Sequence, residues 1–221
     1  MPIVVKPWVR LETDGRSGKR ILRALERYGR LCYMSESKIN ADSAATFVAL
    51  LIKRGHYSVI EHETVTARIV CDRGVSHEIV RHRIGSYSQE STRYCDYATP
   101  RGVTVIDPLF FAEHGEQRRI WLDAMQAAEA AYGQLRRLGV APQAARLVLP
   151  HSVKTELIVT FNLREWRHFF CLRCGAGAHP QIREIALMLL KAMQKHIPIV
   201  FDDFVIDERS KVARTDRSPP S

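Results

Sequence analysis

The densest run of side chains that could do chemistry spans Arg81 to Tyr94, with the sequence RHRIGSYSQESTRY. It combines three arginines, one histidine, three serines, a glutamine and a glutamate, and it has few apolar residues that could anchor a core. Guanidinium groups bind phosphate and carboxylate through paired hydrogen bonds, and hydroxyl and amide groups add further donors. The segment therefore predicts an anion-binding site. The alternative is a solvated surface loop held by Arg–Glu pairs, which contribute little energy.

The backbone expected around this segment decides where its side chains point. On a helix that continues through the segment, Glu78, Arg81 and His82 share one face through i,i+3 and i,i+4 spacing. Past Gly85 we expect an extended chain. Its donors toward an anion would be Ser88, Gln89, Ser91 and Arg93.

The charge balance also favours an anionic partner. The chain carries 33 Lys and Arg residues against 24 Asp and Glu, a formal net charge of +9. Between Arg136 and Arg183, eight basic residues accompany only two acidic ones, Glu156 and Glu165. Such a stretch fits a nucleic acid or a phosphorylated small molecule. We interpret most of the other arginines as the codon bias of a GC-rich genome.

Cysteine and histidine patterns give no metal site. Five cysteines in no paired framework fit a reducing compartment. Cys171 and Cys174 form one CxxC pair without a second, which is more typical of a structural role than of zinc. The nine histidines lack the His-Glu-x-x-His spacing of a helical zinc site. We therefore expect no bound metal.

Hydrophobic periodicity predicts helices alternating with strands, so the fold class is α/β (mixed α+β). Expected strands span residues 8–13, 64–71, 103–106 and 157–161, and expected helices span 17–33, 42–54, 75–83, 120–138, 142–150, 162–173 and 180–197. Asn162, with Glu165 three residues later, predicts a capping-box-like start for the helix over 162–173. We expect one domain over residues 1–207 and a disordered tail over 208–221.

The sequence also predicts a soluble, cytoplasmic protein. The longest apolar stretch, Ala44 to Ile52, is far shorter than a membrane span. Residues 1–10 lack the apolar core of a secretory signal.

Five ordered motifs resemble those of the flavin-dependent thymidylate synthases. They are GHYSVIEH from Gly55, RHR at 81–83 followed by Ser86 and STRY at 91–94, QAARLVLP from Gln143, FNLREWRHFFCLR from Phe161, and AHPQIREIA from Ala178. An Arg-His-Arg match alone is weak, whereas five motifs in the family's order are specific. They cover most of the chain.

The resemblance implies a fold and a reaction. The fold would be a compact domain of that family's type, with helices packed on a central, mostly antiparallel sheet. The reaction would convert dUMP to dTMP, with methylenetetrahydrofolate as the one-carbon donor. FAD, reduced by NADPH, would supply the hydride, so that tetrahydrofolate leaves. Members are homotetramers whose sites combine several subunits, and neither a nucleic acid nor a membrane would be a partner.

Carried onto this sequence, the resemblance assigns three sets of residues. Arg173 would be catalytic, because its cation would stabilise the uracil ring after loss of the N–H proton. The FAD-binding set is His56, Ser58, Glu61, Arg81, His82, Arg83, Gln89, Asn162, Arg164 and His168. The dUMP-binding set is Glu78, Arg81, Gln89, Glu90, Ser91, Thr92, Arg93, Arg146 and Arg173. Ser91 is expected to donate a hydrogen bond rather than to act as a nucleophile, since no base lies at motif spacing.

The sequence departs from the family's pattern at several positions. Gln89 stands where many members have Glu, so a carboxylate role there would be lost or would move to Glu90. His168 stands where Asn is frequent, and Glu78 where Gln is frequent. The CGAGA loop that follows Arg173 is longer than in some relatives. Its length affects any role of His179, which comes after it.

Two other functions compete with this one. A basic nucleic-acid-binding module is suggested by the net charge and by tyrosines interleaved with arginines, at Tyr87, Tyr94 and Tyr97. A recognisable nucleic-acid-binding motif is missing from the sequence, however. A zinc hydrolase built from His and Cys residues is the second alternative. No glycine-rich dinucleotide fingerprint is present, so FAD as the flavin rests on the resemblance.

Overall fold

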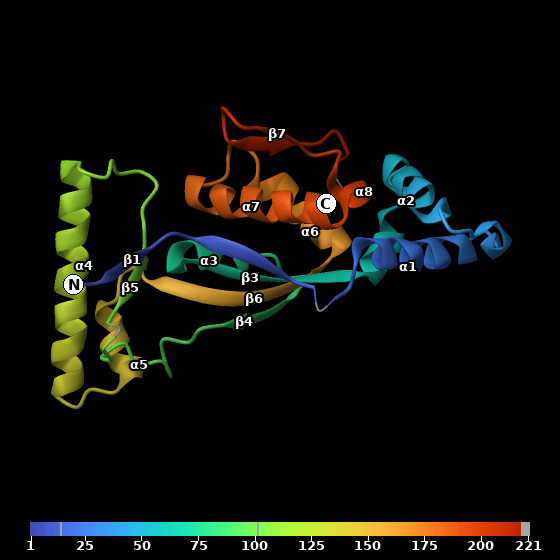
Figure 1. Cartoon of the computed structure of the whole chain (residues 1–221). Coiled ribbons are helices and arrows are strands. Elements are labelled where there is room, and N and C mark those ends of the chain that lie inside the picture. The colour runs from blue at the N-terminus through green and yellow to red at the C-terminus, as the bar shows by residue number, and fades with distance from the viewer. Residues whose placement is uncertain (14, 101, 218–221) are drawn as a thin grey trace. The chain divides into compact units, whose positions relative to one another are not determined.

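The computed structural model describes residues 1–13, 15–100 and 102–217. Its mixed α/β fold confirms the expected class (Figure 1). The helices are α1 (Gly18–Leu31), α2 (Ser43–Lys53), α3 (Arg73–Ile79), α4 (Glu116–Arg137), α5 (Pro142–Ala145), α6 (Leu163–Arg173), α7 (Pro180–His196) and α8 (Pro198–Phe201), with short 3₁₀ helices η1 (Glu36–Lys38), η2 (Tyr57–His62) and η3 (Arg146–Val148). The strands are β1 (Ile3–Val5), β2 (Trp8–Glu12), β3 (Thr64–Asp72), β4 (Ser86–Gln89), β5 (Thr104–Ile106), β6 (Lys154–Asn162), β7 (Val205–Asp207) and β8 (Val212–Arg214).

Most of the long elements begin and end near the expected residues, because their boundary signals are local. The Ser17 side chain accepts the Arg20 N–H at the start of α1. Gly55 and Gly139, which follow α2 and α4, have φ of 73° and 81°, the left-handed conformation that ends a helix. Strands β1, β7 and β8 were not expected, since three residues are too short to show a period.

The described residues form two compact units, and neither is continuous in sequence. Unit 1 comprises Met1–Trp8, Ile69–Arg81 and Ser88–Leu157, and unit 2 comprises Val9–Arg68, His82–Tyr87 and Ile158–Ser221. Strands β3, β4 and β6 each have residues in both units. The sequence contains no sign of this division, because most of its boundaries fall inside strands rather than in linkers. The single domain ending at residue 207 stays a prediction.

The largest sheet has the strand order β2-β3-β6-β4. In unit 2, Thr66 Oγ1 lies 2.8 Å from Thr160 Oγ1, and the Leu163 N–H donates to the Glu63 carbonyl. Residue numbers rise along β3 while they fall along β6, so this pair is antiparallel. The expected antiparallel character of the sheet is therefore confirmed for its central pair.

Unit 1 has a small core beside a parallel strand pair. Strands β1 and β5 are parallel, with Val4 opposite Val105. The buried side chains of Val103, Val105, Met125 and Val153 form the core cluster. Helix α4 runs alongside this strand pair (Figure 1) and contributes Met125.

Unit 2 is built around aromatic side chains of α6. Trp166, Phe169 and Phe170 are fully buried. The Trp166 ring centroid lies 4.6 Å from that of Phe161 in β6, and Phe170 meets Phe201 of α8 at 5.6 Å. Helix α6 packs on α7, and α1 packs on α2 (Figure 1).

The C-terminal segment corrects one expectation. Residues 208–217 have defined structure, since β8 pairs antiparallel with β7 and the Ala213 N–H donates to the Cys174 carbonyl. The buried Arg167 guanidinium also donates to the Arg217 carbonyl. These bonds use backbone groups, so the polar composition that suggested disorder does not reveal them. The remaining four residues of the expected tail lie outside the described residues.

Among the described residues, no helix combines the length and the apolar character that crossing a bilayer would require.

Candidate active site

A hydrogen-bonded chain links three polar side chains in unit 2. Glu165 and Arg173 lie about two turns apart on α6, and His82 belongs to the segment after α3. His82 Nδ1 lies 2.9 Å from Glu165 Oε1, and Arg173 Nε donates to His82 Nε2 at 3.1 Å. His82 and Glu165 are only 5% and 7% exposed, so water competes little for these bonds.

The direction of these hydrogen bonds assigns the tautomer of His82. The Nε–H of Arg173 can only donate, so His82 Nε2 accepts and carries no proton. The ring proton therefore sits on Nδ1 and is donated to the Glu165 carboxylate. The side chain of His82 thus joins a carboxylate to a guanidinium and fixes the position of Arg173.

The first half of α6 is arranged by its N-cap. The Asn162 side chain accepts the Glu165 N–H at 2.8 Å, which confirms the expected cap. The Glu165 carboxylate, which a capping box would direct back to the helix start, contacts His82 instead. Glu165 is therefore a residue of the site that sequence reasoning treated only as a capping residue.

The backbone around His82 differs from the expected helix. Helix α3 ends at Ile79, so the prediction that Glu78, Arg81 and His82 share one helical face is wrong. Past the end of α3, Gly85 lies directly on the Phe161 ring: a Cβ on Gly85 would stand 2.2 Å from its Cδ1.

Tyr87 holds the same segment in place. Its hydroxyl donates to the His82 carbonyl. Burial and the nearby Glu165 carboxylate raise the pKa of Tyr87 to about 12, so it remains a donor at neutral pH. Tyr87 thus holds the backbone of His82, while Glu165 and Arg173 hold its imidazole.

The other expected FAD-binding residues of unit 2 are more exposed. Arg164 on α6 forms an ion pair with Glu61 of η2. His56, Ser58 and Arg83 present exposed side chains, and His168 is half-buried with its ring 5.8 Å from that of His82. Of the FAD set, only Arg81 and Gln89 belong to unit 1.

The expected dUMP-binding residues lie in unit 1, Arg173 excepted. Arg146, at the start of η3, donates to Thr92 Oγ1 at 3.2 Å. Arg93 Nε donates to Gln143 Oε1 at 3.2 Å. Both arginines are exposed, and these contacts to α5 and η3 bring the STRY and QAARLVLP motifs together.

Gln89 and Glu90 make contacts within unit 1. The Gln89 amide nitrogen donates to Ser76 Oγ at 3.0 Å and to Thr155 Oγ1 at 3.1 Å. The Glu90 carboxylate accepts from Lys154 Nζ at 2.7 Å and from the Tyr97 hydroxyl at 2.8 Å. Glu78 and Arg81 lie at the end of α3 and just after it. Nucleotide contacts by these four residues stay predictions.

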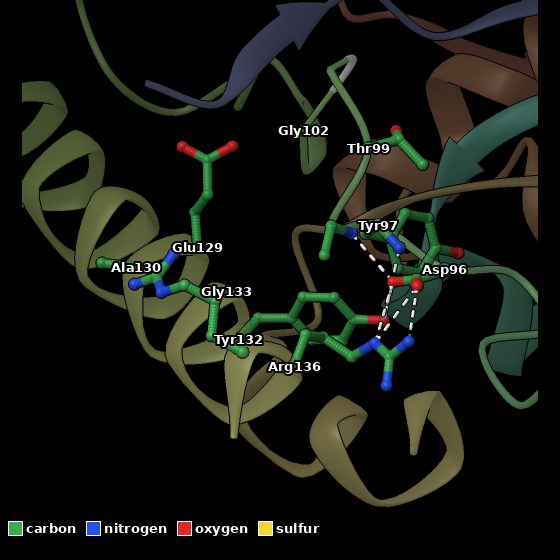
Figure 2. A pocket seen from close by; sticks show the side chains of 11 residues that line it. Asp96, Tyr97, Thr99, Gly102, Glu129, Ala130, Tyr132, Gly133 and Arg136 are labelled. Atoms are coloured by element: carbon green, nitrogen blue, oxygen red, sulfur yellow. Dashed lines mark hydrogen bonds and ion pairs between the residues drawn. The ribbon is translucent and has the colours of Figure 1, made fainter. Parts of the chain in front are cut away.

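The sequence did not predict the side chains that attach residues 95–99 to α4. The Asp96 carboxylate accepts hydrogen bonds from Arg136, at 2.8 Å from Nη2 and at 3.1 and 3.2 Å from Nε, and another from the Tyr132 hydroxyl (Figure 2). Arg136 lowers the pKa of Asp96 to about 2. The residues line a cavity of about 700 Å³ that Glu129 borders at its other end. An aspartate and an arginine 40 positions apart leave no local pattern that would have revealed the pair.

One cluster in unit 2 has the composition of a metal site. Ligand atoms of His82, Glu165 and His168 lie within 4.8 Å of one another. Both ring nitrogens of His82 are already bonded to protein groups, so a metal ion would have to break one of those bonds. The expectation that no metal binds stays a prediction.

Comparison with known proteins identifies the family. A flavin-dependent thymidylate synthase of Geobacter sulfurreducens is 38% identical over 181 residues, which cover 79% of this chain and 78% of that protein. A Mycobacterium tuberculosis protein of the same name is 36% identical over 218 residues, covering 90% and 84%. Residues 19–199 match the family described as thymidylate synthase complementing protein. The chain belongs to the flavin-dependent thymidylate synthase family.

Solved structures agree with this membership. The flavin-dependent thymidylate synthase fold found here resembles the UMP/dUMP methylase PolB from Streptomyces cacaoi bound with 5-Br dUMP, with a TM-score of 0.72 and 26% identity. The match covers 90% of this chain and 95% of that one. The same methylase bound with 5-Br UMP matches with a TM-score of 0.73 at 23% identity, which supports the fold. The chain is therefore an enzyme of this family, as the five motifs predicted.

Proposed function

We propose that this protein methylates dUMP to dTMP with the help of a flavin. One dUMP, one methylenetetrahydrofolate, one NADPH and one proton would yield dTMP, tetrahydrofolate and NADP⁺. The observation that carries the proposal is the Glu165–His82–Arg173 chain, in which the buried Glu165 orients the buried His82 and His82 accepts a hydrogen bond from the Arg173 cation. The identity of NADPH, FAD and the folate rests on the family resemblance.

Arg173 would act by electrostatic stabilisation. Uracil must become a carbon nucleophile before it can accept a one-carbon unit, and loss of the ring N–H proton leaves negative charge on the ring. A guanidinium whose Nε is committed to His82 needs no reorganisation when that charge develops. Such a mechanism requires no covalent enzyme nucleophile.

The phosphate of dUMP would bind in unit 1. A nucleotide monophosphate is close to a dianion, and an arginine can bind it through two hydrogen bonds. Arg93 and Arg146 each donate to one neutral side chain, Gln143 and Thr92 respectively. A phosphate would replace these weak contacts with charge-assisted ones. Ser91 would add a hydroxyl donor to the same phosphate.

The residues of unit 2 fit a flavin dinucleotide. In the absence of a glycine-rich fingerprint, a pyrophosphate needs side-chain cations and hydroxyls. Arg83 and Ser58 are both exposed and suit this role. When bound, the flavin supplies the hydride for the final reduction. His56 would border the flavin and the folate.

An absorption spectrum tests the proposed function directly. The purified protein is incubated with FAD, desalted and scanned, and dUMP is then added. Flavin bands that stay with the protein and shift on adding dUMP would support one site for both. A colourless protein whose spectrum dUMP does not change would contradict the proposal.

Replacing Arg173 tests the assigned role of that residue. Arg173→Ala is expected to keep the flavin, because its charge acts on the uracil ring, and to lose nearly all turnover. The measurement is flavin absorbance together with dTMP formation. A variant that remained active would overturn the role of Arg173 and leave the flavin site standing.

A basic nucleic-acid-binding module remains the second candidate, favoured by the net charge of +9. Binding of that kind weakens steeply as salt rises, because phosphate contacts release counterions. Anisotropy of a labelled random oligonucleotide across a salt series separates the two functions. The absence of steep salt-dependent binding would exclude the module.

A further inference from the structure

A groove in unit 2 contains basic side chains that the proposed site does not use. It has a volume of about 810 Å³ and lies between α1 and the segment that precedes α2. Lys19, Arg20, Arg23 and Arg27 line it from α1. Ile39, Asn40 and Ala41 line the opposite side. The volume falls in the range of small-molecule sites.

The four cations are arranged along one face of the helix. With about 100° of rotation per residue, Lys19, Arg20, Arg23 and Arg27 fall within roughly 100° around the axis. With about 1.5 Å of rise per residue, they extend over roughly 12 Å. All four side chains are exposed. The groove therefore offers a row of positive charges rather than a single anion contact.

These charges are not neutralised within the described part of the chain. There, neither a hydrogen bond nor an ion pair engages the side chains of Lys19, Arg20 and Arg23, and Arg27 lies over the Tyr28 ring at 5.7 Å. Glu26 is the one carboxylate among the groove-lining residues. It is 1% exposed and accepts from Arg30 at 2.7 Å and from Ser43 at 2.9 Å, so its charge is engaged below the surface.

The groove is connected to the expected flavin region through ring contacts. Tyr28, next to Arg27 on α1, has its ring 5.2 Å from that of His62. His62 ends η2, the 3₁₀ helix that carries Ser58 and Glu61 of the FAD set. The Arg27 end of the row is thus linked through Tyr28 and His62 to η2, the segment expected to border the flavin.

We propose that this groove binds the pyrophosphate and the 2′-phosphate of NADPH. The inference rests on the proposed function, which requires a reductant whose three phosphates are spread along an extended molecule. Arginine is the residue that accommodates a 2′-phosphate in dinucleotide sites, and a sequence without a glycine-rich fingerprint must use side chains for the pyrophosphate. Four cations that lack an ionic partner among the described residues, spread over roughly 12 Å, match that charge and that spread.

Equilibrium binding to the flavin-loaded protein tests the assignment without turnover. The probe is 2′,5′-ADP, which carries two phosphate monoesters and cannot reduce a flavin. Arg23→Glu/Arg27→Glu is expected to weaken its binding roughly 100-fold, since each arginine contributes a charge-assisted contact. Arg23→Ala should weaken it roughly 10-fold and guards against a folding defect in the double variant. Arg209→Glu, an exposed arginine of β7–β8, is the matched control and should leave the affinity unchanged.

Supplying electrons by another route separates this proposal from the proposed function. When dithionite reduces the flavin, Arg23→Glu/Arg27→Glu should form dTMP at the wild-type rate, while with NADPH its KM should rise. If the wild type forms no dTMP from reduced flavin, the proposed function fails, whatever the groove binds. If the wild type does not bind 2′,5′-ADP, or binds it no better than the double variant, the groove assignment fails alone. If the double variant lost affinity only for a polyglutamylated folate, the groove would bind the folate tail rather than NADPH, and the assignment would be overturned.

Discussion

His82 has two fixed neighbours, and the difference between them matters for function. Arg173 is the group expected to meet the substrate, whereas Glu165 is bonded to the imidazole of His82 and, through its N–H, to the Asn162 cap of its own helix. Glu165 is therefore a positioning residue. It keeps the proton of His82 on Nδ1, and Nε2 thereby remains an acceptor for the guanidinium.

Glu165→Gln tests this role while conserving size. A glutamine can present its amide NH₂ to Nδ1, which would move the ring proton to Nε2. Two N–H donors, His82 Nε2 and Arg173 Nε, would then face each other. A charge-assisted hydrogen bond contributes about 1.5–3 kcal/mol, so kcat should fall roughly 10- to 100-fold. We expect the flavin content and the KM for dUMP to change little.

Two further variants make the result specific. Glu165→Asp keeps the charge and should recover part of kcat, which a purely structural role would not require. Glu113→Gln alters an exposed glutamate of unit 1 and should match the wild type. Equal kcat in Glu165→Gln and the wild type would remove Glu165 from the site.

The sequence predicted some of these residues but did not predict the contacts among them. Asn162 was predicted as a helix cap because its partner lies three residues away, and the cap is present. The same Asn-x-x-Glu pattern concealed Glu165, whose partner His82 is 83 positions distant. Local rules describe a helix end well and do not report what a buried carboxylate meets across the fold.

At the scale of the element, the turn from α3 into β4 depends on one missing side chain. A methyl group on Gly85 would stand 2.2 Å from Phe161 Cδ1 and 3.1 Å from the Thr160 carbonyl oxygen. Phe161 is 1% exposed and has little room to move. Gly85 is thus the residue that lets the segment with His82 lie close against β6.

Gly85→Ala should displace this segment. Overpacking of this kind costs about 1–3 kcal/mol of stability, and His82 would move with its backbone. We expect a lower urea midpoint together with weaker FAD retention after desalting. Gly177→Ala is a suitable control, because nothing lies within 4 Å of the added methyl. Wild-type FAD retention in Gly85→Ala would show that the close approach is not needed for the site.

A second element-scale feature is the attachment of residues 95–99 to α4 through Asp96 and Arg136 (Figure 2). The hydrogen bonds from Arg136 hold the pKa of Asp96 at about 2, below its ordinary value. A depressed carboxyl pKa means that the stabilisation is complete above about pH 4 and is lost as the pH falls toward 2. The Asp96 side chain is 36% exposed, so solvent screening reduces the contribution to about 1 kcal/mol.

Asp96→Asn should therefore lower the free energy of unfolding by about 1 kcal/mol at pH 7. The difference from the wild type should shrink between pH 4 and pH 2, where the wild-type carboxyl takes up its proton. Urea titrations over this pH range measure it. Asp123→Asn, which alters an exposed surface pair with Arg119, should show no such difference. If the free energies of unfolding of Asp96→Asn and the wild type differed by the same amount at every pH, the effect would come from packing rather than from charge.

For the whole molecule, the two expected ligand sets divide between the two units. Most FAD-binding candidates lie in unit 2, and most dUMP-binding candidates lie in unit 1. The family resemblance adds that sites in a homotetramer combine residues from several subunits. Together they raise the question of whether Arg146 and Arg173 of one site come from the same copy of the chain.

Mixing two inactive variants answers it. Arg146→Ala and Arg173→Ala, co-expressed so that subunits assemble at random, should recover about a quarter of wild-type activity if each site takes these residues from different copies. Activity is measured as dTMP formed per flavin bound. A mixture as inactive as either parent would show that one copy supplies both arginines.

The interleaving of the two units in the sequence has a consequence for how the protein is made. Unit 2 takes Val9–Arg68 from the beginning of the chain and Ile158–Ser221 from its end. On a ribosome that adds about 5–20 residues per second, α1 and α2 are made roughly 7–30 seconds before α6 and α7 are complete and can cover them. During that interval Leu25, Val48 and Ile52, all buried in the finished fold, face solvent or a chaperone. Synthesis of residues 180–214, which form α7 and β8, thereby becomes the step that commits the nascent chain to its structure.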